Sequence, residues 1–213
     1  MQVLILAPNI GDYPSKLSYE TMVRVYKDAK KLGKDVALLE KNGVNPISFY
    51  SFLSFIKPKV KIIVYGGHGT PISWVGQWIL LHVLAPYGFG EVPMVKGRIL
   101  AGVPTCDAGR MLGPIAAKSG AVFVGSIDTM WAGAGPGLSG YKGYDYAKDF
   151  MKTWYTFHIT LITTGCVEDA YEAYRSLVLE LIEKYEEERY NDWEWHAWAL
   201  NENLRKLRIY YPE

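Results

Sequence analysis

The chain has 213 residues, of which 49% are hydrophobic and 21% charged, and its formal net charge is +1. A net charge this small gives no electrostatic basis for binding nucleic acid or an acidic membrane surface, so neither is expected as a partner. No run of about 18 apolar residues is present, and we therefore expect no transmembrane helix. The length and composition are those of one α/β domain, spanning 1–213, with a sizeable core.

The start of the chain and its cysteines indicate a compartment. The opening residues 1–6 form an apolar run without a basic region or a cleavage site, so we interpret them as a first strand and not as a signal peptide. Two cysteines, Cys106 and Cys166, are too few for a disulfide framework, which predicts free thiols and a cytoplasmic location. Only two glutamines occur beside many Lys and Glu residues, a composition that leans toward a thermophilic source.

The first half of the chain alternates short apolar runs with helical patterns. Buried strands are predicted at 3–7, 35–39 and 60–65. Between them, one helix is predicted from an N-cap at Ser18 to Gly33, and another from Asn45-Pro46 to Pro58. Continuous apolar strands separated by helices are typical of a parallel sheet with helices on both faces.

The second half continues this alternation and then becomes mainly helical. Strands are predicted at 98–103, 121–125 and 207–211. Helices are predicted at 73–84, 108–118, 146–161 and 170–185. The segments 85–96 and 126–143 are rich in glycine and are predicted to be loops. Because long loops in compact domains are often functional, 126–143 is a candidate binding loop.

Two candidate catalytic residues follow successive central strands. Cys106 comes after the strand 98–103 and just before the helix predicted at 108–118, whose dipole favours a thiolate. His68 follows the preceding apolar strand, within a Gly-Gly-His-Gly sequence. If the two strands are parallel neighbours, both side chains lie at the same edge of the sheet. An imidazole base and a thiol nucleophile then share one site.

Backbone amides near these two residues can complete a hydrolytic site. The N–H groups of Gly69 and Cys106 are candidates for binding the oxyanion of a tetrahedral intermediate, and Gly67 allows a substrate to approach the backbone closely. Each residue also has a structural interpretation, since a lone cysteine is commonly a small buried hydrophobe and a lone histidine is commonly structural. The pairing of His68 and Cys106 at the ends of successive strands favours the catalytic interpretation.

The order of these features resembles the caspase-like cysteine peptidases, a group that includes caspases, legumain, gingipain, clostripain, separase and the caspase-like domains attached to tetratricopeptide repeats. Residues 120–126 are similar to the Gly-Ala strand of gingipain and the repeat-attached domains, and residues 165–171 to the start of a late helix. Residues 195–205 resemble the closing aromatic strand and turn, although Asn201-Glu202-Asn203 replaces the family's Gly-Asp-Pro. The resemblance covers residues 60–210.

The resemblance implies a three-layer α/β/α sandwich around a mainly parallel sheet, and a cysteine endopeptidase that acts on a peptide or protein substrate without a cofactor. His68 is then the general base or acid, and Cys106 the nucleophile. Asp107 takes the position of an acidic residue in the primary specificity pocket of legumain, which implies cleavage after basic residues. The positions at which caspases place the walls of the substrate cleft correspond to Ser126, Asp128 and Trp131.

Other interpretations stay open. Asp107 can be a helix N-terminal residue, Asp128 a loop cap and Trp131 a packing anchor. Because Pro104-Thr105 stands where the family often has Ala or Ser, the protein can also be a catalytically silent caspase-like binding module. A third possibility is an amidotransferase-like or deglycase-like protein with a reactive elbow cysteine, although there the cysteine precedes the histidine. The spacing of histidines and cysteines predicts no metal site.

Overall fold

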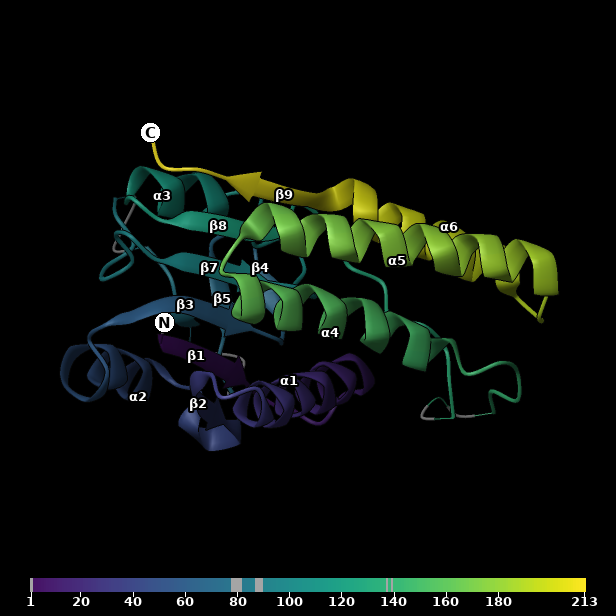
Figure 1. The fold of residues 1–213 in the computed structure, drawn as a ribbon, viewed down its shortest axis with the longest axis horizontal. Coiled ribbons are helices and arrows are strands. Elements are labelled where there is room, and N and C mark those ends of the chain that lie inside the picture. Colours follow the sequence, from purple (N-terminus) through teal and green to yellow (C-terminus); the bar gives the residue numbers. More distant parts are fainter. Residues whose placement is uncertain (1, 78–81, 87–89, 137, 139) are drawn as a thin grey trace.

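The computed structural model describes residues 2–77, 82–86, 90–136, 138 and 140–213. Its central strands are β1 (Gln2–Ala7), β2 (Asp35–Glu40), β3 (Val60–Tyr65), β7 (Ile99–Gly102), β8 (Val122–Ser126) and β9 (Leu207–Tyr210). They form a six-stranded sheet in the order β2-β1-β3-β7-β8-β9 (Figure 1). Neighbouring strands pair in parallel, except that β9 runs antiparallel to β8. The mainly parallel sheet predicted from the apolar runs is therefore confirmed.

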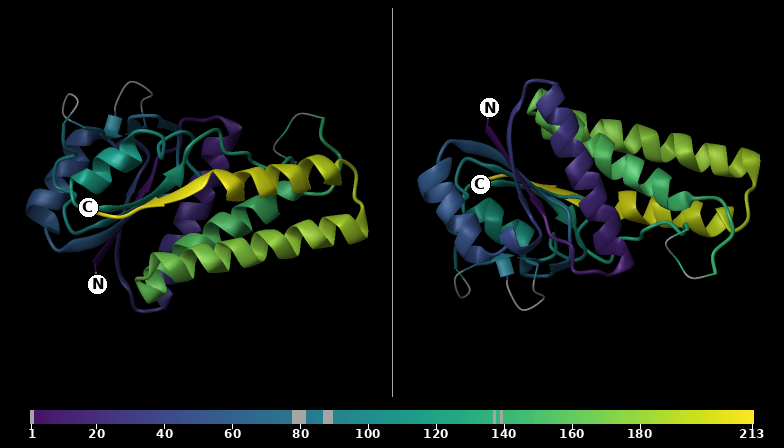
Figure 2. Two further views of the ribbon diagram at one scale, coloured as in Figure 1. Left: turned by 90° about the horizontal axis from the view of Figure 1, so that it is seen from above. Right: turned by 90° about the horizontal axis from the view of Figure 1, so that it is seen from below.

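Helices flank both faces of this sheet (Figure 2). One face is covered by α1 (Tyr13–Lys31), α4 (Tyr146–Thr164) and α5 (Val167–Glu188). The other face is covered by α2 (Pro46–Ser51), the π-helical turn η2 (Phe52–Ile56) and α3 (Leu112–Lys118). The remaining helical segments are the 3-10 turn η1 (Lys41–Gly43) and α6 (Trp193–Lys206), which packs against α5 and leads into β9. None of the helices described is long and apolar enough to cross a membrane.

The central strands contribute to two hydrophobic cores, because successive side chains of a strand point to opposite faces of the sheet. In β1, Val3 and Ile5 belong to the core under α1, α4 and α5. Leu4 and Leu6 belong to the core on the opposite face, under α2 and α3. All four side chains are buried. Burial on both faces explains why this strand appears in the sequence as a continuous apolar run instead of an alternating one.

Helix α1 begins before the N-cap predicted at Ser18. Asp12 is the N-cap, and its Oδ1 accepts a hydrogen bond of 2.8 Å from the Ser15 amide. Pro14 fits the first turn, where the backbone N–H has no partner in the helix. Ser18 is instead buried inside the helix, where its hydroxyl donates to the Ser15 carbonyl. Gly33, with φ at +71°, follows the end of the helix as predicted.

The helix predicted at 73–84 is wrong for the residues that the structure describes, and 78–81 lie outside them. This region instead contains a small antiparallel sheet of β4 (Gly69–Thr70), β5 (Ser73–Val75) and β6 (His82–Leu84). Trp74 is fully buried, and its ring stacks on Tyr65 with a centroid distance of 4.9 Å. The hydroxyls of Thr70 and Ser73 are 2.7 Å apart across the first strand pair. These contacts with neighbouring strands override the helical pattern of the segment.

The aromatic stretch 195–200 is also corrected, because it lies inside helix α6 and is not a closing strand. His196, Leu200 and Asn203 are all buried, and their spacing of three or four residues gives the helix one inward face. The turn expected at Asn201-Glu202-Asn203 is part of the same helix. The final strand predicted at 207–211 is confirmed as β9.

Candidate functional site

A cavity of about 410 Å³ lies at the carboxyl ends of the parallel strands. Its walls include Tyr13 after β1, His68 after β3, Cys106 after β7 and Trp131 after β8. Strand β2 is added on one side of β1, whereas β3, β7 and β8 are added in turn on the other side. The direction in which the sheet grows therefore reverses between β1 and β3. Ligands of open α/β sheets bind at such switch points, at the carboxyl edge.

His68 and Cys106 line this cavity together. The strands before them, β3 and β7, are parallel neighbours in which Tyr65 pairs with Gly102. Next to His68, Gly69 packs on the turn that holds the cysteine. A methyl group at Gly69 would lie 2.3 Å from the Cys106 carbonyl oxygen, so only glycine allows this approach. Among the bonds between described residues, the amide of Cys106 has no acceptor, which leaves it available to a ligand.

Asp12 is a site residue that the sequence interpretation missed. Its Oδ2 lies 2.7 Å from Nε2 of His68, while its Oδ1 caps helix α1. Burial acts to raise the pKa of Asp12, but hydrogen bonds from Ser15 and the neighbouring imidazole lower it overall. An ionised Asp12 accepts the proton on Nε2, which leaves Nδ1 of His68 as the nitrogen that can take a proton.

Tyr65 anchors the backbone of the histidine. Its buried hydroxyl lies 2.6 Å from the His68 carbonyl oxygen and 2.5 Å from that of Val75. Burial raises the pKa of Tyr65, so the phenol stays protonated and remains a donor. The turn after β3 is thus tied to strand β5, and this fixes the backbone position from which the His68 side chain extends.

Cys106 does not stand at a helix N-terminus, contrary to the expectation from the sequence. Helix α3 begins only at Leu112, and the residues between run as turns. Asp107 has a left-handed conformation with φ at +56°. The amides of Asp107 and Gly109 bond to the carbonyls of Asp128 and Ser126, at 3.1 and 2.7 Å. Because these amides donate to the end of β8 and the loop after it, residues 107–109 do not form the first turn of helix α3.

The surroundings of Cys106 favour the neutral thiol. Burial raises the pKa of Cys106, and the amide of Met130, 3.3 Å from Sγ, opposes this only in part. Nearby Asp107 and Asp128 add to the upward shift. The predicted thiolate, stabilised by a helix dipole, is therefore corrected to a thiol that needs a base to remove its proton.

We expect iodoacetamide to modify Cys106 slowly at pH 7 and faster as the pH rises, because only the thiolate reacts and the pKa of this thiol is raised. The rate is measured by mass spectrometry in a Cys166→Ser variant, where Cys106 is the single thiol. An unstructured cysteine peptide serves as the reference. A midpoint for Cys106 more acidic than that of the peptide would contradict the neutral-thiol state.

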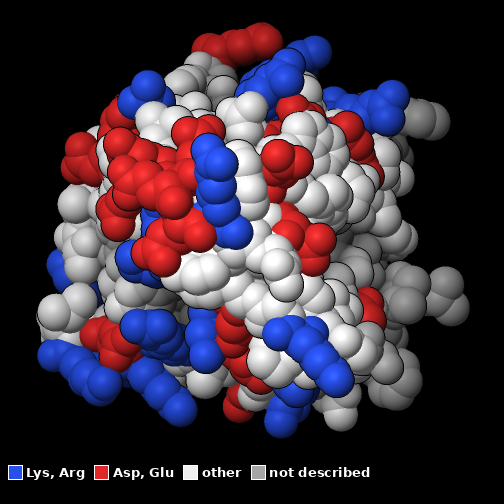
Figure 3. Space-filling view, turned by 90° about the vertical axis from the view of Figure 1, so that its right-hand side faces the viewer, with Lys and Arg blue, Asp and Glu red and all other residues white. Residues whose placement is uncertain are grey.

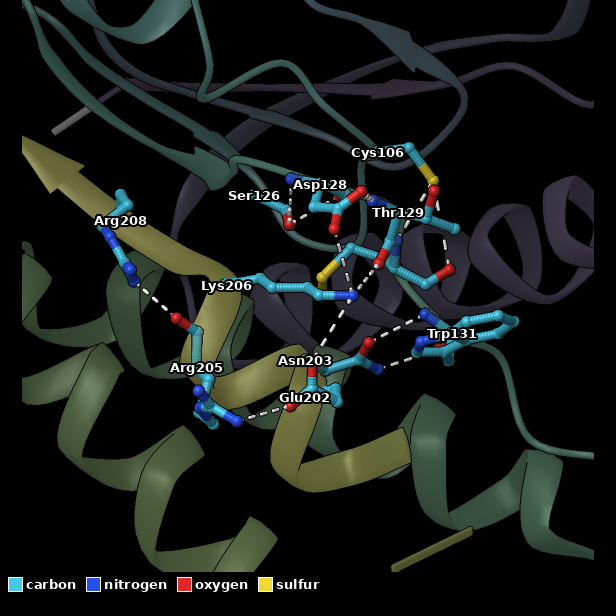
Figure 4. Close-up of polar contacts among 11 residues, drawn as sticks. Cys106, Ser126, Asp128, Thr129, Trp131, Glu202, Asn203, Arg205, Lys206 and Arg208 are labelled. Carbon is cyan, nitrogen blue, oxygen red and sulfur yellow. Dashed lines mark hydrogen bonds and ion pairs between the residues drawn. The ribbon is translucent and has the colours of Figure 1, made fainter. Parts of the chain in front are cut away.

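The other predicted site residues divide between the cavity wall and the loop behind it. Trp131 lines the cavity, whereas Gly69, Asp107, Ser126 and Asp128 do not. The buried hydroxyl of Ser126 donates to the Asp128 carbonyl at 2.8 Å. The Asp128 carboxylate accepts from the Thr129 amide at 2.7 Å and lies 3.5 Å from Nζ of Lys206 (Figure 4). The Thr129 amide and Lys206 lower the pKa of Asp128, which acts as the loop cap that the sequence allowed.

Two amide side chains hold the loops on either side of the cavity, and neither was predicted. Asn203 accepts from the Trp131 amide at 2.7 Å and donates to the Trp131 carbonyl at 2.8 Å (Figure 4). Gln77 makes the equivalent pair of bonds with the backbone of Asn9, in the loop that leads to Asp12. No local sequence signal identifies either residue, because each acts on a partner about seventy positions away in the chain.

Within the described ranges, no group of three or more His, Cys, Asp and Glu side chains is arranged to hold a metal ion. The side chains that line the cavity include the thiol of Cys106 and the imidazole of His68, whose carboxylate partner is Asp12. A scan of the sequence against protein-family models finds no match, and a search of curated protein sequences finds none either.

Proposed function

We propose that the protein is a cysteine peptidase of the caspase-like type, in which Cys106 attacks a peptide carbonyl and His68 transfers the protons. The observation that carries this proposal is the shared cavity of Cys106 and His68, with Asp12 bonded to Nε2 of the imidazole. A half-buried thiol that shares a cavity with a histidine bonded to a carboxylate has the composition of a nucleophile, a base and an orienting group.

In the proposed reaction, Nδ1 of His68 takes the proton from the thiol as Sγ bonds to the carbonyl carbon. Asp12 stabilises the imidazolium that forms, and the amide of Cys106, which has no acceptor among the described residues, binds the oxyanion. His68 then gives the proton to the leaving amine, and the C–N bond breaks to leave a thioester. Water, deprotonated by His68, hydrolyses the thioester and restores the thiol.

A catalytically silent caspase-like module is the second candidate. The raised pKa of Cys106 favours it, because a neutral thiol is a weak nucleophile without an effective base. The amidotransferase-like alternative has less support, because the histidine precedes the cysteine in this chain. The oriented imidazole favours the peptidase over the silent module, since a structural histidine needs no ionised partner at a cavity wall.

Fluorogenic peptides with varied residues before the cleaved bond test the proposal, in the presence of a reducing agent. We expect turnover that Cys106→Ala abolishes and that His68→Ala lowers about 10²- to 10⁴-fold. Cys166→Ala, which removes a thiol outside the cavity lining, is the matched control and should keep full activity. Turnover that survives Cys106→Ala, or no turnover of any peptide by the wild-type protein, would contradict the proposal.

A further inference from the structure

Apolar side chains form much of the wall of the cavity. Tyr13 comes from the start of α1, Trp154 from α4, and Met130, Trp131 and Leu138 from the loop after β8. No Asp, Glu, Lys or Arg side chain is among the described residues that line the cavity. The cavity has a volume of about 410 Å³ and is also lined by His68 and Cys106. This volume and the mostly apolar lining are typical of a ligand pocket.

This wall is built before any ligand arrives. Trp154 is 1% exposed and packs within the main core, so its position is set by the fold. Trp131 is held through its backbone by Asn203, and its ring packs against Trp195 and Trp198 with centroid distances of 5.8 and 5.6 Å. A wall that is already rigid loses little conformational freedom when a ligand binds, which favours a specific subsite over a chance gap.

The charge around the cavity gives no preference for a charged ligand. At the end of the molecule shown in Figure 3, acidic side chains gather in one area, with some basic side chains beside them and more on the rest of the same face. The last turns of α5 carry the exposed glutamates Glu183, Glu186, Glu187 and Glu188. A Lys, Arg, Asp or Glu side chain entering the cavity would lose part of its hydration without meeting an Asp, Glu, Lys or Arg among the described lining residues.

We propose that this wall is the primary specificity subsite, and that it takes a large apolar side chain, aromatic or leucine-like, next to the bond that is cleaved. The proposal rests on the peptidase function and names its substrate class. It replaces the preference for basic residues, because that preference required Asp107 to line the pocket and Asp107 lies outside it. Apolar and aromatic contacts supply the discrimination between substrates in such a pocket.

The test compares tripeptide coumarin amides that end in Phe, Leu, Ala, Lys or Asp. We expect kcat/KM for the Phe and Leu substrates to exceed that for the Lys and Asp substrates about 10- to 200-fold. Trp131→Ala should lower kcat/KM for the Phe substrate strongly and for the Ala substrate only slightly. Phe55→Ala, which removes an aromatic ring that is 85% exposed and outside the cavity lining, is the matched control and should leave the preference among substrates unchanged.

A second variant tests the charge argument by gain of function. Leu138 is 39% exposed, so Leu138→Asp should be tolerated by the fold while placing a carboxylate at the cavity wall. We expect this variant to raise turnover of the Lys substrate relative to the Phe substrate. An unchanged preference would overturn the assignment of this wall as the specificity subsite.

Binding to the Cys106→Ala protein separates the subsite from the peptidase function. Calorimetry with acetylated tripeptide amides ending in Phe or Lys should show tighter binding of the Phe peptide, and Trp131→Ala should remove the difference. Phe-selective binding without any wild-type turnover would leave the subsite standing and remove the peptidase. Turnover with a Lys preference would retain the peptidase and overturn the subsite. Equal binding of the two peptides would also overturn it.

Discussion

Asp12→Asn is expected to lower kcat/KM about 10²- to 10⁴-fold with little loss of stability. Asn is as good an N-cap as Asp, so its oxygen can keep the bond from the Ser15 amide and helix α1 stays intact. The new amide nitrogen then faces Nε2 of His68 and donates to it. This places the imidazole proton on Nδ1, which can no longer accept a proton from Cys106.

The comparison with Asp12→Ala separates the two roles of this residue. Alanine removes the helix cap as well as the histidine partner, so it should cost about 0.5–2 kcal/mol of unfolding free energy in addition to the loss of activity. Thermal unfolding and kcat/KM are measured on both variants. If Asp12→Asn retained wild-type kcat/KM, Asp12 would cap helix α1 without any role in orienting His68.

The pH dependence follows from the same carboxylate. The pKa of Asp12 is lowered in the folded protein, so its stabilising contribution is complete above the pKa of the unfolded chain and is lost as the pH falls through the lower, folded value. Asp12 is therefore ionised throughout the neutral range in which a peptidase assay is run. A change of activity between pH 6 and 8 would therefore not report on the ionisation of Asp12.

The elements that the sequence predicts well are those with one dominant pattern. Strands β1 and β3 are apolar on both faces, and helices α4 and α5 carry apolar stripes of helical period, so local pattern and tertiary packing agree. The helix predicted at 73–84 was wrong because the burial of Trp74 against Tyr65 decides the structure of this segment. Helix α6 was not predicted from the pattern, because polar His196 and Asn203 occupy its inward face and interrupt the apolar stripe; the strand expected at 195–200 came from the family resemblance.

The candidate site shows the same division between local and long-range information. His68 and Cys106 could be found, because each follows an apolar strand and the parallel order of these strands brings their ends together. Asp12 could not, since it lies 56 positions before His68 and its local signal is that of a helix cap. The prediction that Cys106 is a thiolate was wrong for a related reason. The amides after Cys106 bond to a loop about twenty residues further along, so no helix starts there.

Asn203→Leu is expected to destabilise the protein by about 2–4 kcal/mol and to reduce activity. Asn203 is fully buried, and both of its polar atoms are bonded to the backbone of Trp131. Leucine has a similar volume but leaves that N–H and C=O without partners, at about 1–3 kcal/mol for each buried group. For a chain of this length the melting temperature should fall by roughly 5–15 °C.

The loss of activity has a structural cause that stability alone does not supply. The amide of Met130, the residue before Trp131, donates to the sulfur of Cys106, so a loop freed from Asn203 no longer places this donor or the indole wall. Asn201→Leu makes the same substitution on the exposed side of α6 and should stay within about 0.5 kcal/mol of wild type. Urea unfolding and kcat/KM at a temperature where both variants are folded measure the two effects. If Asn203→Leu lost stability and kept full kcat/KM, the link between α6 and the cysteine would be structural and not catalytic.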